Sequence, residues 1–295
     1  MNKWRKWPIE YIVKNDPMFP KKLAEIKNCP EGLYYRGKWN PQLFEKIIAI
    51  VGSRKMTKYG RDVIDRFMPG IVDRNITVIS GFMYGIDTEA HTSCLALGGK
   101  TIAILGGGLD WLTPAENGNL YDSILESGGL VISEYEPDFK PTLWSFPQRN
   151  RIVSALSTVG VLIVEAGLKS GSLITAKSAL KQKKEVFAIP GSITSKSSEG
   201  TNWLIKNKAA KMVTDLGDIF INELGLKMDQ GRLFKDYSDL SDMERKIIET
   251  LENEEMTVDE LTQRLKSPMT EVSSALSLML LRDLIVEEKG KLYLA

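Results

Sequence analysis

The residues best suited to chemistry lie in short glycine-rich stretches that each follow an apolar run. Gly52, Ser53 and Arg54 form a triplet directly after one such run, and arginine carries a fixed positive charge that suits phosphate. Similar stretches are SGFMYGID (80–87), LGGGLD (105–110), LKSGSLITA (168–176) and PGSITSKSSEGTN (190–202). Glycine lets a ligand approach backbone N–H groups closely, and helix N-termini favour anions. Short loops often contain glycine for structural reasons alone, so one such loop is weak evidence for an anion site. Several of them at one edge of a sheet are stronger evidence.

A second stretch with chemical potential is WSFPQRNRIVSALS (144–157). Trp144 and Phe146 supply aromatic rings, which stack on nucleic-acid bases. Arg149 and Arg151 follow closely, and guanidinium groups hold phosphates. This combination is typical of single-strand binding. The structural alternative is that the rings fill the core while the arginines pair with acidic side chains.

Signals for an enzyme or a metal site are weak. The first turn reads GSRKMT rather than GxGxxG, and no GxxxxGK[ST] loop is present. Glu134, Glu165 and Asp110 lie singly at strand ends, where acids commonly cap helices or pair with arginine. The one histidine, His91, excludes a multi-histidine metal site, and the two cysteines form no CxxC pair. We therefore predict no catalytic residues, no metal and no cofactor.

The charge of the chain is unevenly distributed. The total is only +1, but residues 140–211 hold twelve Lys and Arg against three Asp and Glu, a net +9. Residues 236–295 hold seven against fourteen, a net −7. A local basic surface favours phosphate binding, because neutralised phosphates release condensed counterions. The central region is therefore the candidate nucleic-acid surface.

The glycine stretches need a sheet that brings them together. From residue 47 to about 220, apolar runs alternate with helical patterns. The runs are IIAIV (47–51), TVIS (77–80), TIAIL (101–105), LVIS (130–133), VGVLIV (159–164) and EVFAI (185–189), and the helical patterns are 59–73, 87–97, 114–126, 150–157 and 172–182. This alternation predicts an α/β fold, an extended, Rossmann-like, doubly wound and mainly parallel sheet. Ligands of such sheets bind beyond the carboxyl ends of the strands.

The rest of the chain divides by composition. Residues 1–45 are predicted to be a short lead-in that packs on the Rossmann-like domain, 46–225. Residues 226–237 are polar and read as a linker. Residues 238–295 show three amphipathic helices followed by a hairpin, the pattern of a small winged-helix domain.

Composition also bounds the location of the protein. The 295 residues are 43% hydrophobic and 26% charged, which is ordinary for a soluble globular chain. No run approaches the roughly 18 apolar residues of a membrane span, and the N-terminus lacks the apolar core of a secretion signal. We expect a cytoplasmic protein with no membrane partner.

Taken together, these segments resemble the DprA/Smf family of DNA-processing proteins. The matching stretches are IAIVGSRKMTKYG, SGFMYGIDTEAH, KTIAILGGGLD, LVISEY, FPQRNRIVSALS, VEAGLKSGSLITA, VFAIPGS and EGTNWLI, which cover roughly residues 16–225. The resemblance implies a protein that binds single-stranded DNA, protects it and hands it to the RecA recombinase during natural transformation. It also implies a homodimer. Many family members begin with a helical SAM-like domain, which the first 45 residues are too few to form.

The resemblance also assigns site residues. It implies that Arg54 holds a DNA phosphate. It further implies that the aromatic and basic residues before the RNR motif face DNA, with Lys177 and the Gly171-Ser172 loop on the same rim. The predicted DNA contacts are Gly52, Ser53, Arg54, Lys140, Trp144, Phe146, Arg149, Arg151, Gly171, Ser172 and Lys177. The acidic winged-helix domain is expected to contact protein or to regulate, since duplex DNA binding needs positive charge.

Two other functions remain open on the sequence. One is a Rossmann-type nucleotide-processing enzyme similar to the phosphoribohydrolases, although EAGLKSGSLITA stands where their PGGxGTxxE signature is expected. The other is a winged-helix transcription regulator with a ligand-sensing sheet domain, which would bind duplex DNA more tightly than single strands.

Overall fold

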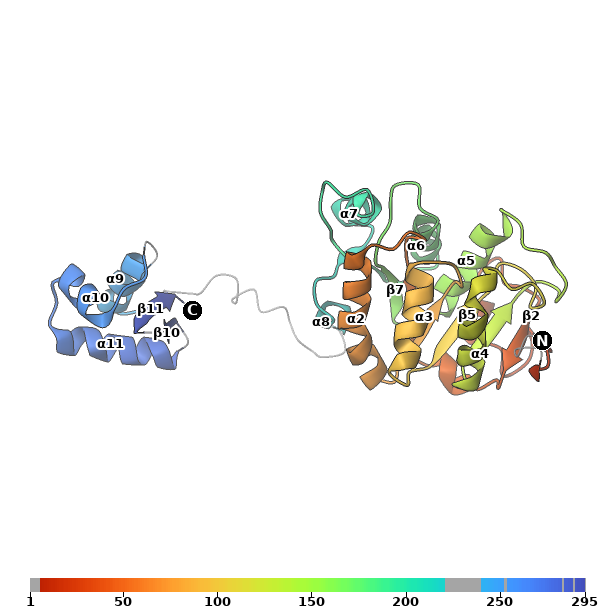
Figure 1. Ribbon diagram of the computed structural model, residues 1–295, viewed down its shortest axis with the longest axis horizontal. Helices are drawn as coiled ribbons and strands as arrows, with labels where there is room; N and C mark the ends of the chain where they lie inside the picture. Colours follow the sequence, from red (N-terminus) through yellow and green to blue (C-terminus); the bar gives the residue numbers. More distant parts are fainter. Residues whose placement is uncertain (1–5, 221–239, 252–253, 283, 289, 295) are drawn as a thin grey trace. The chain divides into compact units, whose positions relative to one another are not determined.

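The computed structural model describes residues 6–220, 240–251, 254–282, 284–288 and 290–294 (Figure 1). The chain splits into two compact units, Met1–Leu224 and Gly225–Ala295, and each is described by itself. The linker expected at 226–237 lies outside the described residues. Among the described helices, none has the length and apolar character needed to cross a membrane.

The first unit is built on one sheet in which nine described strands lie in the order β1-β2-β6-β5-β4-β3-β7-β8-β9. The strands are β1 (Glu10–Val13), β2 (Gly32–Gly37), β3 (Ile47–Val51), β4 (Thr77–Ser80), β5 (Thr101–Ile104), β6 (Leu130–Ser133), β7 (Gly160–Ile163), β8 (Val186–Ala188) and β9 (Lys211–Met212). All neighbours from β6 to β9 pair in parallel. The expected mainly parallel α/β sheet is confirmed.

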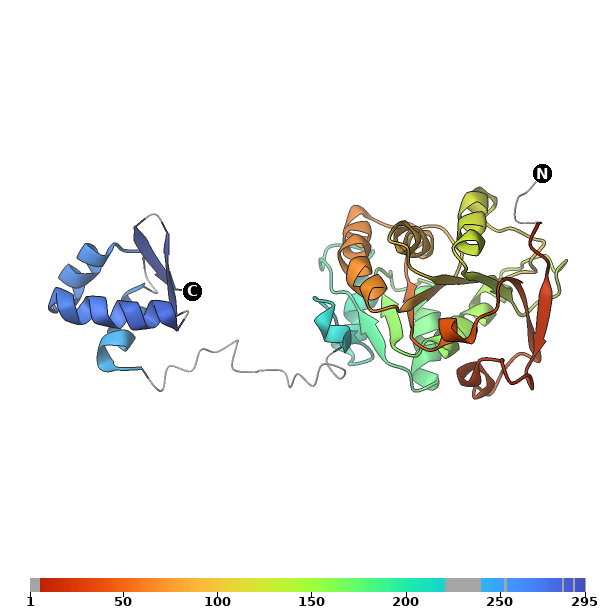
Figure 2. The same ribbon diagram turned by 90° about the horizontal axis from the view of Figure 1, so that it is seen from below.

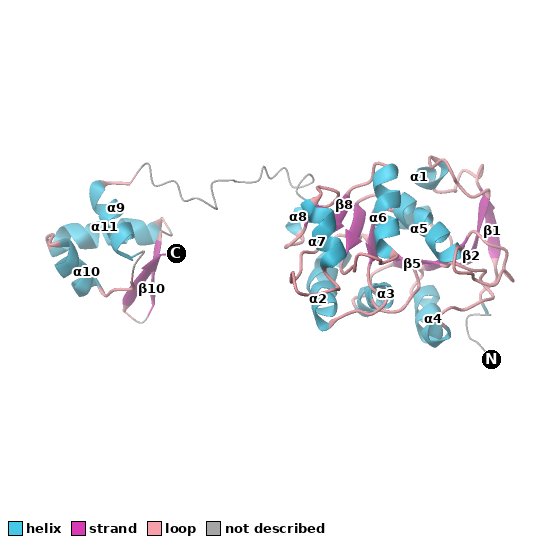
Figure 3. Ribbon diagram, turned by 90° about the horizontal axis from the view of Figure 1, so that it is seen from above, coloured by secondary structure: helices cyan, strands magenta, loops and turns pink. Residues whose placement is uncertain are grey.

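Helices cover both faces of this sheet. They are α1 (Lys21–Ala24), α2 (Lys58–Asp73), α3 (Ile86–Ala96), α4 (Gly118–Glu126), α5 (Ser145–Leu156), α6 (Ser172–Lys181), α7 (Glu199–Lys206) and α8 (Gly217–Phe220), with 3-10 turns η2 (Pro41–Phe44) and η3 (Ala115–Asn117). Figure 3 shows α2, α3 and α4 on one side of the sheet and α1, α5 and α6 on the other, and Figure 2 shows the same layers from below.

The central strand β3 explains why the sheet is covered twice. Ile47 and Ala49 pack into the core on the α5–α6 face, whereas Ile48 and Ile50 pack into the core beneath α2 and α3. All five residues of β3 are buried. A strand buried on both faces reads as a continuous apolar run, because alternate side chains enter different cores.

The N-terminal segment does more than pack against the sheet. β2 pairs antiparallel with β6, and β1 pairs antiparallel with β2, so both are strands of the sheet. The glycine that ends β2, Gly37, adopts φ 109°. Leu23 of α1 and Leu33 of β2 are fully buried in the same core as β3.

Helix α5 begins earlier than the sequence pattern indicated. The pattern predicted a helix over 150–157, but α5 runs from Ser145, with Pro147 in its first turn. Proline is tolerated there because the first N–H groups of a helix have no partner inside it. The longer helix carries both Phe146 and Arg149, which the sequence had suggested lay ahead of it.

The second unit has the expected winged-helix form. Its elements are α9 (Asp242–Leu251), α10 (Val258–Leu265), α11 (Met269–Leu281), β10 (Ile285–Glu288) and β11 (Lys291–Leu294). The two strands form an antiparallel hairpin. Thr257 and Glu260 form a reciprocal capping box at the start of α10. Leu261, Val272 and Leu292 lie in a separate apolar core.

Candidate nucleic-acid interface

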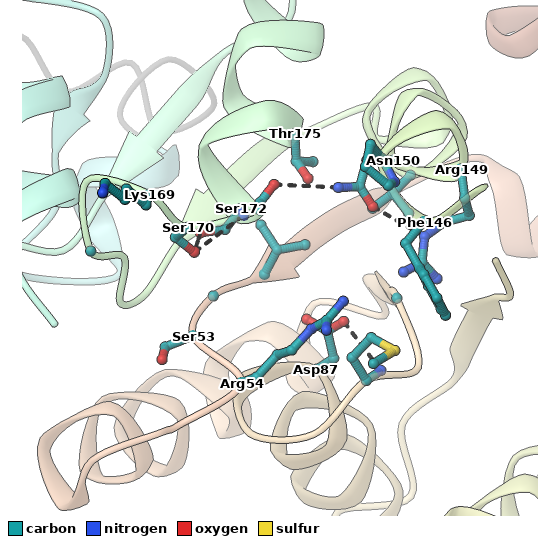
Figure 4. Close-up of a pocket in the computed structure, with 18 of the residues that line it drawn as sticks. Ser53, Arg54, Asp87, Phe146, Arg149, Asn150, Lys169, Ser170, Ser172 and Thr175 are labelled. Carbon is teal, nitrogen blue, oxygen red and sulfur yellow. Dashed lines mark hydrogen bonds between the residues drawn. The ribbon is translucent and has the colours of Figure 1, made fainter. Parts of the chain in front are cut away.

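A pocket of about 540 Å³ opens at the carboxyl edge of the sheet, where the loops after β3 and β7 diverge (Figure 4). β3 lies between β4 and β7, so the chain order reverses there. Such a switch point is the general ligand site of doubly wound sheets. The pocket is lined by residues 51–55, Gly81, Met83, Asp87, Phe146, Pro147, Arg149, Asn150, Val153, Gly167, residues 169–172 and Thr175.

Arg54 supplies an exposed cation to this pocket. It takes part in none of the ion pairs found among the described residues. Its guanidinium carbon lies 5.6 Å from the centre of the Phe146 ring, which suits a cation–π contact. Figure 4 shows Arg54 on one side of the pocket and Ser170, Ser172 and Thr175 on the other. The site therefore places an exposed guanidinium, which forms no ion pair among the described residues, beside an aromatic face.

The backbone around Arg54 is held by the neighbouring glycine loop. Ile86 N–H donates to the Ser53 carbonyl at 3.1 Å. Gly85 has φ 75°, and a Cβ there would lie 2.3 Å from Ser53 O. Only glycine allows this approach, so the GFMYGID loop fixes the position of the GSR loop. The Ser53 hydroxyl accepts from Lys55 N–H at 3.0 Å, which shapes the turn from within.

Arg149 and Asp87 lie beneath the pocket. Arg149 is only 3% exposed and donates to the Ile104 carbonyl and, through Nε, to Asn150 Oδ1. Burial raises the pKa of Asp87 to about 6, against the opposing charge of Arg149. Burial also lowers the pKa of Arg149 to about 10. The guanidinium thus helps to form the floor of the pocket and is mostly enclosed by protein.

The far side of the pocket is formed by the start of α6. Ser170 and Ser172 hydroxyls lie 2.7 Å apart, and Asn150 Nδ2 donates to the Gly171 carbonyl at 3.3 Å. Gly171 is exposed, and a Cβ added there would meet nothing within 4 Å. The first N–H groups of α6 thus border the same pocket as Arg54, an arrangement that favours an anion.

Four predicted contacts lie outside this pocket. Lys140 lies 5.6 Å from the centre of the Trp111 ring. Trp144 is 55% exposed and packs edge-on against Tyr135 and Phe139. The other two, Arg151 and Lys177, lie on α5 and α6 without lining the pocket, and Lys177 is exposed.

Arg151 has structural partners. Its guanidinium donates to both carboxylate oxygens of Glu134, at 2.6 and 2.7 Å, and to the Asn28 carbonyl. Both side chains of this ion pair are largely buried. The geometry favours the structural alternative stated for the arginines, with Glu134 as the partner of Arg151.

Sequence reasoning missed several pocket residues. Lys55 and Lys169 are exposed cations next to Arg54 and Ser170, and Asn150 joins the two sides of the pocket. Both lysines stand within or beside the glycine stretches, so the signal was present. The contribution of Asn150 depends on the packing of α5 against α6, which no local pattern announces.

The groups suited to acid–base chemistry have structural roles. Glu165 is buried and accepts from Thr57 N–H and Thr57 Oγ1, at 2.9 and 2.5 Å, at the start of α2. The ring nitrogens of His91 lie 2.5 Å from Thr101 Oγ1 and 3.0 Å from the Gly81 carbonyl. Burial lowers the pKa of His91 to about 4, so the ring is neutral at pH 7. In the described ranges, no three His, Cys, Asp or Glu side chains group as metal ligands.

Comparison with known proteins places these features in a family. Residues 10–224 match the family model described as DNA recombination-mediator protein A, and residues 235–291 match the DprA winged helix domain. Protein Smf of Escherichia coli is 36% identical over 92% of this chain and 74% of its own length. The DNA processing protein DprA of Streptococcus pneumoniae is 42% identical over 69% and 71%.

Solved structures agree. The X-ray structure of DprA from Streptococcus pneumoniae has a TM-score of 0.66 at 40% identity, covering 74% of this chain and 75% of that one. DNA processing protein A from Helicobacter pylori, studied for its single-stranded DNA binding mode, has a TM-score of 0.64 at 32% identity. The match covers 73% of this chain and 95% of the Helicobacter pylori chain.

Proposed function

Because the chain belongs to the DprA/Smf family of DNA recombination-mediator proteins, we propose that it binds single-stranded DNA at the carboxyl edge of its sheet. Arg54 holds a phosphate, and Phe146 presents its ring to a neighbouring base. The observation that supports this most directly is the exposed Arg54 beside the Phe146 ring, in the pocket at the switch point of the sheet.

The wider role follows the family. The protein protects incoming single strands and loads RecA recombinase onto them during DNA uptake, natural transformation and recombination. It works as a cytoplasmic homodimer without catalysing a reaction. The structure offers little to the alternative of a nucleotide-processing enzyme, since Glu165, its candidate base, is occupied by two hydrogen bonds from Thr57.

The other predicted contacts have graded roles. Gly52, Ser53, Gly171 and Ser172 border the phosphate site directly. Lys140, Trp144 and Lys177 are exposed and supply outer contacts along the strand. Arg149 supports the pocket from beneath, and Arg151 keeps α5 in place through Glu134.

The test is a titration of single-stranded oligothymidine with the Arg54→Ala variant. Loss of a charge-assisted phosphate contact should weaken binding about tenfold or more, since 1.4 kcal/mol corresponds to tenfold. The control is Arg66→Ala, which removes an exposed arginine from α2 that does not line the pocket. Equal affinity of parent and Arg54→Ala would refute the assignment.

A further inference from the structure

A second hollow, of about 920 Å³, lies beside the Arg54 pocket. It is bordered by the segment from α1 to Asn28, by α5 and by the end of α6. Pro147 lines both hollows, and both lie along the same pair of helices. Figure 3 shows α1, α5 and α6 together on one side of the sheet. We call this hollow the α1–α6 groove.

The α1–α6 groove is strongly basic. Its cations come from three separate segments, and among its described lining residues Glu25 is the one acid. The lining cations are Lys22, Lys27, Arg151, Lys181, Lys183 and Lys184.

Three of these cations have partners within the fold. Lys22 lies 3.3 Å from Glu25, Arg151 pairs with Glu134, and Lys184 Nζ donates to the Ser157 carbonyl at 2.7 Å. The other three, Lys27, Lys181 and Lys183, are exposed. Within the described part of the chain, their ammonium groups take part in no ion pair or hydrogen bond.

Helix stability alone does not account for this cluster. A helix C-terminus favours a cation, and that explains Lys181 in the last turn of α6. It does not explain Lys27, which comes from another segment. Burial lowers the pKa of Lys184, the charge of Lys22 lowers it further, and Glu25 acts in the opposite direction. A bound polyanion would offset the repulsion between Lys22 and Lys184.

The chemistry of the lining selects the kind of ligand. Apart from Ile26 and Pro147, the groove is lined by polar and charged side chains. Stable protein interfaces have an apolar core, which is absent from these described residues. A phosphate chain needs spaced cations and little apolar surface. Along α6, Ser172 and Lys181 are separated by about 13 Å at 1.5 Å per residue, so one strand can reach both hollows.

We propose that the α1–α6 groove binds further phosphates of the same DNA strand that Arg54 holds, with the strand crossing Pro147. This inference rests on the proposed function and adds the direction in which the strand leaves the pocket. Lys27, Lys181 and Lys183 are its phosphate contacts. Because this contact is to the backbone, it adds affinity for longer strands without sequence preference.

The experiment compares oligothymidines of about 4 and about 16 nucleotides, the limits of common single-strand sites, at several salt concentrations. The test protein carries Lys27→Gln, Lys181→Gln and Lys183→Gln. Its control carries Lys46→Gln, Lys206→Gln and Lys208→Gln, exposed lysines that line neither hollow. Lys208 (φ 54°) matches Lys183 (φ 57°) in backbone conformation.

For the long strand, the slope of log K against log salt should become shallower by about 2, at roughly 0.7 per lost phosphate contact. The short strand should bind the test and control proteins equally. In the parent protein, the long strand should protect Lys27, Lys181 and Lys183 from amine acylation, and the short strand should not.

Other outcomes separate the two proposals. If Arg54→Ala weakens binding while the triple variant keeps the parent slope and the lysines stay reactive, the groove inference is wrong and the proposed function stands. If the control variant shows the same change in salt dependence, the change comes from net charge alone, and the inference is wrong. The inference is also wrong if the triple variant binds single strands like the parent but loses binding to duplex DNA or to an acidic protein. A parent that binds no single strand overturns the proposed function itself.

Discussion

The guanidinium carbon of Arg54 lies 5.6 Å from the centre of the Phe146 ring, although the two residues belong to a loop after β3 and to helix α5. The contact joins the cation proposed to hold a phosphate to the ring proposed to stack on a base. Phe146 in turn packs closely over Gly106, where a Cβ would lie 2.6 Å from the ring. Two loops of the carboxyl edge and helix α5 therefore position the proposed phosphate contact, Arg54, against the proposed stacking ring, Phe146.

Replacing Phe146 by alanine should weaken single-strand binding. Stacking of a base on an aromatic ring contributes about 1–3 kcal/mol, so affinity should fall about fivefold to more than a hundredfold. Phe146→Tyr keeps the ring and should stay near the parent. The measurement is fluorescence anisotropy with oligothymidine. A matched control is Leu143→Ala, which removes an exposed side chain, 93% accessible, from the preceding loop. Unchanged binding by Phe146→Ala would show that the ring only fills space.

Gly85→Ala should both destabilise the first unit and weaken binding. Gly98 is a control of equal φ, 75°, at which a Cβ would meet nothing within 4 Å, whereas Gly85 combines that φ with ψ −125°. Gly98→Ala should lower the free energy of unfolding by about 1–2 kcal/mol, because alanine disfavours a positive φ. Gly85→Ala should cost more, because its Cβ would meet the Ser53 carbonyl, and it should displace Arg54. Thermal unfolding and DNA titration measure the two effects, and equal losses from both variants would count against the loop contact.

His91 should contribute to the free energy of unfolding at neutral pH, and this contribution should be lost in acid. Its folded pKa of about 4 lies below the ordinary 6.5, so the stabilising contribution is present above pH 6.5 and is lost as pH falls through 4. Between pH 6.5 and pH 5 the contribution should fall by about 2 kcal/mol, at 1.36 kcal/mol per unit.

Denaturant unfolding of the parent and of His91→Gln checks this. Glutamine does not titrate, so the free energy of unfolding of the variant should lose about 2 kcal/mol less than the parent over that pH range. The difference between the two proteins removes the opposing contribution of Asp87. In the parent, the single histidine ring should titrate near pH 4 by nuclear magnetic resonance. A midpoint near 6.5 would contradict its burial.

Removing residues 240–295 should leave single-strand affinity within about threefold. That unit lies in the acidic tail, where acids outnumber cations, and α11 carries no lysine or arginine within its bounds, so the helix offers no cation to duplex DNA. Leu278 and Leu281 are exposed on α11, at 49% and 82%, which suits contact with a protein. The measurement compares single-stranded and duplex DNA with both chains. Loss of duplex binding on truncation would assign the unit to DNA instead.

The sequence by itself determined the strands and the loops that form the site. Continuous apolar runs such as 47–51, repeated in alternation with helical patterns, indicate a parallel sheet covered on both faces, which places the glycine loops at one edge. The GSR triplet and the other motifs were enough to indicate the DprA/Smf family. The amphipathic pattern with the period of a helix similarly predicted the helices of the winged-helix unit.

Only the tertiary structure decided what each cation does. Arg54, Arg149 and Arg151 look alike in sequence, yet one is exposed at a pocket, one is buried above Asp87, and one pairs with Glu134. Their surroundings come from residues far away in the chain, which local patterns do not encode. The same holds for the α1–α6 groove, which Lys27 and Lys181 both line because α1 and α6 lie on the same face of the sheet.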